Sequence, residues 1–103
     1  SSMLKGVSAL KNDESYIIGY ETKKRLAGQS LLGVEAFWQC WNDRDSIPAE
    51  LRDKTIFFDG DVLQSPDGNR CSLYLSWDGD EWRWHYRWLD SNRYSDFVSA
   101  CAS

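Results

Sequence analysis

Four side chains around one predicted hairpin are of types that could do chemistry together. His85 is the only histidine in the chain, and Arg83 and Arg87 lie two residues to either side of it. An imidazole can carry a proton near neutral pH, and guanidinium groups bind carboxylates or phosphates through paired hydrogen bonds. Tyr74, on the strand before, would add an aromatic ring to the same face. The sequence therefore predicts a small cationic and aromatic binding surface made of Tyr74, Arg83, His85 and Arg87.

No catalytic residue is predicted from the sequence. A nucleophilic site would have to be assembled around His85, and in either register of the hairpin no serine or tyrosine is placed beside it by design. An ordinary surface histidine explains this residue better. A small enzyme with its site around His85, Arg83 and Arg87 is kept as the alternative hypothesis, less favoured than a binding protein.

Neither a metal nor a cofactor is expected. Two Asp-Gly-Asp triplets, at 59–61 and 78–80, lack the spacing of a calcium loop, and aspartate beside glycine is typical of turns. We therefore interpret both triplets as turns. The chain also lacks a glycine-rich phosphate loop, a Cys-x-x-Cys pair and a His-Glu-x-x-His sequence.

The hairpin that positions these side chains is predicted by strict alternation. From 81 to 88 aromatic residues alternate with charged ones, and residues 71–77 alternate in the opposite parity. Paired side chains must share a face, so a three-residue loop is excluded. A two-residue turn at Asp78-Gly79 and a four-residue loop from Asp78 to Glu81 both keep the faces pure, and turn chemistry favours the shorter. The alternation turns four aromatic side chains inward: Trp82, Trp84, Tyr86 and Trp88.

A third strand is expected at 55–63, joined to the hairpin by a turn at 65–69. A four-residue loop from Pro66 to Asn69 would place Val62 opposite Leu73, Gly60 opposite Leu75 and Phe58 opposite Trp77. A glycine within a strand indicates a bulge or a close approach by another group, which we expect at Gly60. Residues 94–100 are predicted to be a short edge strand or an irregular tail.

Residues 34–42 predict an amphipathic helix. Its apolar residues recur at i, i+3, i+4 and i+7, with Ser30 as a candidate N-cap. This helix would cover the aromatic face of the hairpin. Residues 46–51 predict a short second helix, capped by Ser46 with Pro48 in its first turn.

The first 28 residues are the least defined. The spacing at 3–10 favours a short helix, the composition of 15–20 favours a strand, and 21–27 favours a helix that ends at Gly28. The predicted fold class is α+β: an antiparallel meander of three to four strands with one face packed on an amphipathic helix. We expect a single domain over 1–103, with a helical segment at 30–53 and the antiparallel sheet at 55–100.

Charge and composition exclude some functions. The chain has 103 residues, with 12 Lys and Arg against 16 Asp and Glu, and a net charge of -4. This balance argues against nucleic acid as a partner. Three widely spaced cysteines, no leader peptide and no long apolar run predict a cytoplasmic protein with reduced thiols and no membrane partner. Six tryptophans exceed what a core of this size commonly uses, which suggests an indole exposed for recognition. Their fit to the sheet pattern nevertheless favours the interpretation that nearly all of them pack in the core.

The part of the chain from about 30 to 100 resembles a known group of sequences. The residues that carry the likeness are Ile56 to Gly60, Val62 to Arg70, Leu73 to Trp77, Trp82, Trp84, Arg87 to Leu89, Phe37, Trp38, Trp41, Ile47 and Pro48. They are similar to the C-terminal module of uncharacterised bacterial proteins, in the style of products of mobile, integron-type gene cassettes. The resemblance implies that hairpin and helix form one unit, and it implies no activity or site residue.

The leading hypothesis is a small non-enzymatic binding or protein-interaction domain. It would use the outer sheet face, or an aromatic groove if the helix covers only part of the aromatic face. Its partner would be a protein or a small ligand, and a homodimer is left open. A third hypothesis, an acidic inhibitor that mimics nucleic acid, would require carboxylates gathered on one face.

Overall fold

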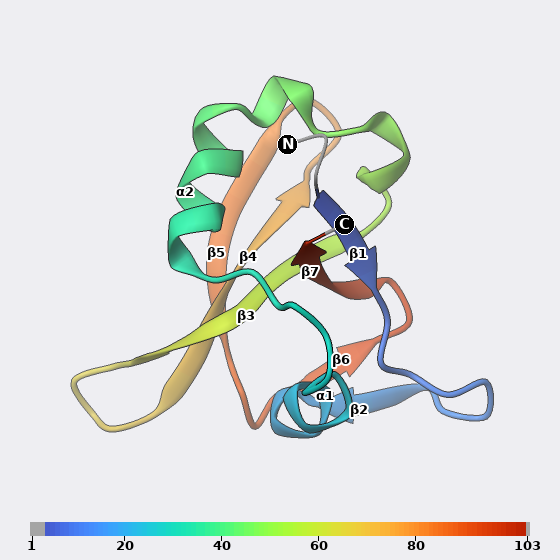
Figure 1. Ribbon diagram of the computed structural model, residues 1–103, viewed down its shortest axis with the longest axis vertical. Helices are drawn as coiled ribbons and strands as arrows, with labels where there is room; N and C mark the ends of the chain where they lie inside the picture. Colours follow the sequence, from blue (N-terminus) through green and yellow to red (C-terminus); the bar gives the residue numbers. More distant parts are fainter. Residues whose placement is uncertain (1–3, 103) are drawn as a thin grey trace.

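A computed structural model describes residues 4–102 of the chain (Figure 1). In this range the helices are α1 (Gly19–Arg25) and α2 (Val34–Asn42), followed by 3-10 turns at Arg44–Ser46 and Ala49–Leu51. The strands are β1 (Leu4–Val7), β2 (Tyr16–Ile18), β3 (Thr55–Gln64), β4 (Arg70–Trp77), β5 (Trp82–Trp88), β6 (Asn92–Tyr94) and β7 (Phe97–Ala102). Met3, at the start of the helix predicted over 3–10, lies outside the described residues.

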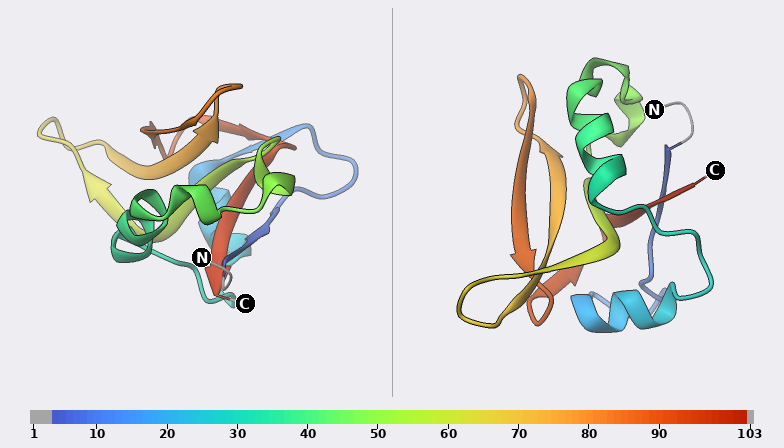
Figure 2. Two further views of the ribbon diagram at one scale, coloured as in Figure 1. Left: turned by 90° about the horizontal axis from the view of Figure 1, so that it is seen from above. Right: turned by 60° about the vertical axis from the view of Figure 1, so that its left-hand side comes forward.

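The described strands form a main sheet in the order β1-β7-β3-β4-β5 and a small sheet of β2 and β6. The antiparallel meander β3-β4-β5 and the α+β class are confirmed. The main sheet is mixed, however, because β7 runs parallel to β3 and antiparallel to β1. Helix α2 lies on one face of the main sheet. Helix α1 and the small sheet lie together at the opposite end of the molecule from α2 (Figures 1 and 2).

Helix α2 has the predicted bounds and packs its apolar stripe on the sheet. Phe37 and Cys40 are buried, and the core around them is drawn from both layers. Ser30 is not the N-cap: the helix begins after Gly33, and the carboxylate of Asp61 accepts a hydrogen bond from the Val34 N–H at 2.9 Å. The side chain of Asp61, distant in the sequence, thus caps the start of α2, where local spacing favoured Ser30. The buried core residues are Phe37, Cys40, Ile47, Ile56, Phe58, Leu73, Leu75, Trp82, Val98 and Ala100.

The β4–β5 hairpin has the four-residue loop, one of the two that the alternation allowed, and the two-residue turn that turn chemistry favoured is wrong. Trp77 faces Trp82 and Leu75 faces Trp84. The carboxylate of Asp78 accepts hydrogen bonds from the backbone N–H groups of Asp80 and Glu81, at 3.1 and 3.0 Å. These bonds stabilise the longer loop, which propensity for Asp-Gly turns alone does not reveal.

The predicted β3–β4 register is wrong on both sides of the irregularity that we expected at Gly60. Phe58 faces Leu73, and after a register shift Leu63 faces Cys71. The cause lies at Gly60, where the chain segment 31–33 approaches so closely that an added Cβ would lie 2.5 Å from the Leu31 carbonyl oxygen. The Gly60 N–H donates to the Leu32 carbonyl at 2.8 Å. The bulge and the close approach expected at this glycine are therefore both confirmed.

The strand predicted at 94–100 is neither an edge strand nor a tail. Residues 92–94 form β6 in the small sheet, and β7 lies inside the main sheet between β1 and β3. Residues 98–101 are all buried, as expected for a strand covered on both faces.

The short helix predicted at 3–10 is also wrong, because residues 4–7 form β1. At Gly6 an added Cβ would lie 2.6 Å from a methyl group of Val98, so this strand packs closely on β7. The strand and helix expected next are confirmed as β2 and α1, but the helix both begins and ends two residues earlier than predicted. The second predicted helix, at 46–51, is replaced by the two 3-10 turns, with Pro48 as the N-cap of the later turn.

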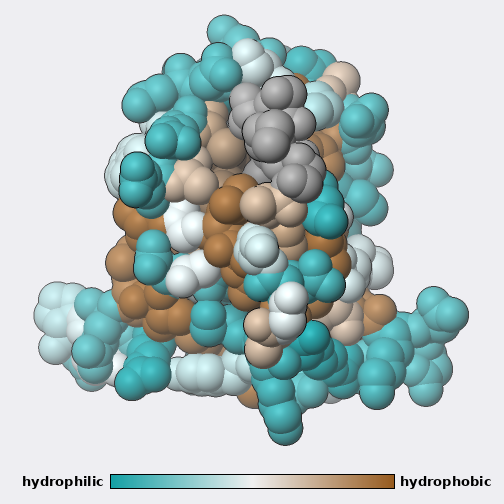
Figure 3. All heavy atoms as spheres, in the orientation of Figure 1, coloured by the Kyte–Doolittle hydropathy of each residue, from teal (hydrophilic) through white to brown (hydrophobic). Residues whose placement is uncertain are grey.

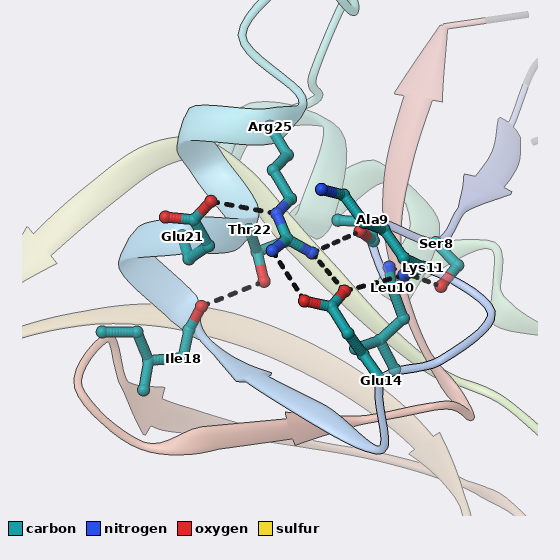
Figure 4. A network of polar contacts seen from close by, with 9 residues as sticks. All are labelled: Ser8, Ala9, Leu10, Lys11, Glu14, Ile18, Glu21, Thr22 and Arg25. Carbon is teal, nitrogen blue, oxygen red and sulfur yellow. Dashed lines mark hydrogen bonds and ion pairs between the residues drawn. The ribbon is translucent and has the colours of Figure 1, made fainter.

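Arg25 ties α1 to the loop that precedes β2 (Figure 4). Its guanidinium donates to both carboxylate oxygens of Glu14, at 2.5 and 2.8 Å, and to Glu21 at 2.9 Å. The hydrogen bonds from Arg25, and then that from the Lys11 backbone N–H, lower the pKa of Glu14 to about 2. One arginine therefore fixes a loop that has little apolar surface of its own.

A buried ion pair joins the small sheet to the main sheet. Asp59 accepts hydrogen bonds from Arg93 at 2.7 and 2.9 Å and from the Ser99 hydroxyl at 2.7 Å. The Arg93 guanidinium also lies 3.9 Å above the Phe57 ring. Burial by itself would raise the pKa of Asp59, but the hydrogen bonds and charge of Arg93, with Ser99, hold it below its ordinary value. Interpreting the 59–61 triplet as a turn is wrong, since Asp59 is an interior ion-pair partner and Asp61 caps α2.

Candidate functional site

The four predicted binding residues share the outer face of the β4–β5 hairpin. Tyr74 lies opposite His85, with ring centroids 6.2 Å apart, and Arg83 and Arg87 flank the histidine on the same strand. Tyr74 also packs on the Phe57 ring, with centroids 5.0 Å apart. The alternation in the sequence thus brings these side chains to one face.

Both arginines of this face are engaged by neighbours. Arg83 pairs with Asp78 through its Nε and with Glu81 at 3.2 Å. The hydrogen bond from Arg83, together with backbone N–H groups of the loop, lowers the pKa of Asp78 to about 2. Arg87 donates twice to the Asn92 carbonyl oxygen, at 3.1 and 2.8 Å. The guanidinium groups thereby stabilise the chain segments on either side of β5.

The side chain of His85 folds back against the backbone of β5. Its Nδ1 lies 2.9 Å from the Tyr86 carbonyl oxygen, and the two rings are stacked with centroids 4.9 Å apart. A backbone carbonyl can orient an imidazole but cannot exchange a proton with it. The geometry around His85 is that of a ring folded against its own strand.

The inner face of the hairpin carries a group of exposed rings that the sequence only partly indicated. Helix α2 buries Trp82, but Trp84 is 42% exposed and Tyr86 43% exposed. Trp38, on α2 itself, is 42% exposed. Together with Leu63, which is also exposed, these side chains are named here the aromatic surface: Trp38, Leu63, Trp84 and Tyr86. Apolar side chains gather at the surface just below α2 (Figure 3).

A buried ring supports the two indoles of the aromatic surface. Trp38 and Trp84 meet edge to face with centroids 5.6 Å apart, and the fully buried Phe37 contacts both rings, at 4.9 and 5.8 Å. Each indole therefore sits on a regular element and rests on a packed ring. Such rings lose little conformational freedom when a partner covers them.

A shallow apolar groove of about 310 Å³ continues from Tyr86. Leu73 and Cys71 form its floor, and Leu63 with the 64–66 loop forms its wall. Burial raises the pKa of the Cys71 thiol, so this cysteine behaves as an apolar side chain. The three cysteine side chains are buried, and none forms a disulfide within residues 4–102.

The backbone of β5 is paired with another strand along one edge only. Among the described strands β5 pairs with β4 alone. The Leu89 N–H donates to the Arg70 carbonyl at 2.9 Å, and the Asp78 N–H donates to the Glu81 carbonyl at 3.1 Å. By the alternation of an antiparallel ladder, odd-numbered residues of β5 bond to β4. The N–H and C=O groups of Trp82, Trp84, Tyr86 and Trp88 consequently point away from β4, along what we call the open edge. On this edge the Trp88 carbonyl accepts the Ser91 N–H at 3.1 Å, and the Tyr86 carbonyl lies 2.9 Å from His85 Nδ1.

Sequence reasoning missed the exposure of Trp38 and the roles of Asp59 and Arg93. Trp38 falls on the apolar stripe of α2, but it lies at the side of that stripe, where the sheet ends. A signal for the ion pair existed in the interruption of an apolar strand by Asp59, whose partner could not be identified without the fold.

Comparison with protein-family models, curated proteins and solved structures finds no match to this chain. Within residues 4–102 no group of three or more His, Cys, Asp or Glu side chains is placed to hold a metal ion. No helix in this range is both long and apolar enough to cross a bilayer.

Proposed function

We propose that this protein is a non-enzymatic protein-interaction domain that binds an apolar segment of a partner protein on the aromatic surface. One observation carries the proposal: Trp38, Trp84 and Tyr86 are each more than 40% exposed, and the two indoles rest on the fully buried ring of Phe37. Exposed apolar patches with tryptophan and tyrosine are typical of interfaces, where such residues supply most of the binding energy.

The chemistry of the groove favours a protein segment over a small molecule. A small-ligand site encloses most of its ligand and presents several convergent polar groups. This groove is shallow, and among its lining residues only Gln64, Ser65 and Tyr86 have polar side-chain groups that could orient a ligand. An apolar peptide segment needs neither enclosure nor many polar contacts, because its own backbone and flanks remain in water.

The other hypotheses have less support. For an enzyme around His85, Arg83 and Arg87, each of these side chains would have to leave a structural partner before it could act. For a nucleic-acid mimic, the carboxylates would have to lie together. Asp59 is instead buried, Glu14 is paired with Arg25 at one end, and Asp78 is paired with Arg83 at the β4–β5 loop.

Selection from a random peptide library displayed on phage tests the proposal. The library is selected on the wild-type protein and, in parallel, on the Trp84→Ser/Tyr86→Ser double variant, and the enriched peptides are synthesised. We expect apolar peptides whose dissociation constant, measured by calorimetry, rises at least about tenfold with Trp38→Ala or with Tyr86→Ser. Tyr94→Ser, which removes an equally exposed ring on β6, is the matched control and should leave binding unchanged. The proposal is wrong if wild type and double variant enrich the same peptides.

A further inference from the structure

We propose that the open edge of β5 pairs antiparallel with the same edge of a second copy of this chain, with Trp84 on the twofold axis. The first support is the character of the edge. β5 has seven residues, contains no proline and pairs with β4 without a register shift. The other outer strand, β1, has four residues. Short edge strands are protected by their length, whereas a long regular one is a template for strand pairing.

The backbone geometry permits a complete ladder between two copies. A twofold axis perpendicular to the sheet keeps each face on its own side, so even-numbered residues face even-numbered residues. These are the residues whose N–H and C=O groups lie on the open edge. Trp84 would exchange both hydrogen bonds with Trp84 of the second copy, and Trp82 would do so with Tyr86. The Tyr86 carbonyl, which His85 Nδ1 holds in the single chain, would accept the Trp82 N–H of the second copy instead.

The charges along β5 select this register. Asp78, Asp80 and Glu81 lie at one end of the strand, and Arg87 lies at the other. Antiparallel pairing about Trp84 sets Glu81 opposite Arg87 of the second copy, and the symmetry repeats this contact. A register shifted by two residues would set Arg83 opposite Arg87 twice in one direction, or Arg83 opposite Arg83 in the other, and both arrangements are repulsive. With Trp84 on the axis Arg83 faces His85, and the charge of Arg83 is offset by its own Asp78 and Glu81.

The pairing would also cover the exposed indoles. Trp84 meets its own copy across the axis, and both α2 helices lie on the same face of the joined sheet. Trp38, which contacts Trp84 at 5.6 Å, is thereby brought near the axis. This inference stands on the strand edge and its charges, and it does not require the peptide groove.

Charge reversal tests the interface by rescue. Sedimentation velocity over about 1 to 500 µM protein should show a concentration-dependent dimer for wild type. Glu81→Arg and Arg87→Glu should each raise the dissociation constant at least about tenfold, since attraction becomes repulsion at two places. An equimolar mixture of the two variants should form a heterodimer, and the double variant should regain the wild-type constant. Neither rescue can arise from a variant that has merely lost its fold.

Cysteine cross-linking tests the register. In the proposed ladder the two Trp84 Cα atoms lie about 5.5 Å apart, within the range of a disulfide, so Trp84→Cys should form a covalent dimer on oxidation. The two His85 positions are diagonal neighbours at about 7 to 8 Å, too far for a disulfide, so His85→Cys should not. A wild-type protein that remains monomeric at the highest concentration overturns the inference, and so does cross-linking through position 85 in preference to 84. Peptide binding to a strictly monomeric protein would leave the proposed function intact.

Discussion

At the scale of single residues, Asp59 has the strongest structural role. It receives hydrogen bonds from Arg93 and Ser99, and its backbone carbonyl accepts another from Lys23 at 2.6 Å. Strands β3, β6 and β7 and helix α1 therefore meet at one aspartate. Losing one partner of a buried ion pair costs more than the pair contributes, because the other charge remains buried without compensation.

Replacing Asp59 by asparagine is expected to lower the free energy of unfolding by about 3 to 5 kcal/mol, measured by urea denaturation at pH 7. The Asp59→Asn/Arg93→Met double variant should lose clearly less than the sum of the two single losses, because it no longer buries an uncompensated charge. Additive losses would contradict the account of Asp59 and Arg93 as one coupled unit.

Glu14 gives the fold a defined sensitivity to acid. Its pKa is lowered from 4.5 to about 2 in the folded chain, so between these values the unfolded chain binds the proton first. The contribution of Glu14 is then complete above pH 4.5 and is lost as the pH falls toward 2. Comparing wild type with Glu14→Gln by urea denaturation should show a stability difference that is constant above pH 5 and shrinks below pH 4.5. A difference independent of pH down to 2 would exclude this role.

The alternation in the sequence predicted which side chains share the candidate site but not what they contact. The alternation of residues 81–88 was enough to place Arg83, His85 and Arg87 on one face with Tyr74. It could not show that Asp78 and the Asn92 carbonyl already engage the arginines, because these contacts depend on loop conformations. The same pattern could not show where α2 ends above the sheet, and hence that Trp84 is exposed.

At the scale of elements, those defined by contacts between residues near in the sequence were predicted correctly, whereas those that depend on distant residues were not. Helix α2 was predicted with its observed bounds, since its apolar spacing extends over two full turns. The Ser30 N-cap and the shorter β4–β5 turn were wrong, because the side chains of Asp61 and Asp78 satisfy backbone groups at these two places. The β3–β4 register failed because it shifts between Phe58 and Leu63, around a glycine whose contact with the distant segment 31–33 is not visible in the local pattern.

Gly60→Ala tests that close approach. A methyl group at this position would meet the backbone of residues 31–33, which is fixed between β3 and β7, so we expect a loss of at least about 2 kcal/mol in the free energy of unfolding. Gly28→Ala is the control, because no atom lies within 4 Å of its added methyl group. Thermal and urea unfolding of the control should match wild type to within about 0.5 kcal/mol. Equal effects of the two substitutions would show that the bulge is not sterically required.

At the scale of the whole molecule, the arrangement of β7 is what the sequence revealed least. Sequential strands usually lie side by side, which favoured a fourth strand next to β5. The chain instead crosses to the far side of β3 and adds β7 parallel to it, between β3 and β1. The run of small and apolar residues from Phe97 to Ala102 is the one local sign of a strand covered on both faces.

A chain that lacks residues 96–103 should fail to fold, because β1 then has no neighbour and β3 loses one side of its ladder. Amide spectra from NMR should show narrow dispersion, and near-UV circular dichroism should be lost. Adding a synthetic peptide of residues 95–103 at excess should restore the dispersed spectrum. A truncated chain with native dispersion would mean that β7 is dispensable to the main sheet.

The central position of β7 has a consequence for synthesis in the cell. On the ribosome, β3, β4 and β5 leave the exit tunnel before β7, which lies between β3 and β1 in the main sheet. Until β7 emerges, the side of β3 that it covers is presented to the surrounding solution as an unpaired strand edge. The main sheet is therefore expected to close in one late step, after β7 has been synthesised.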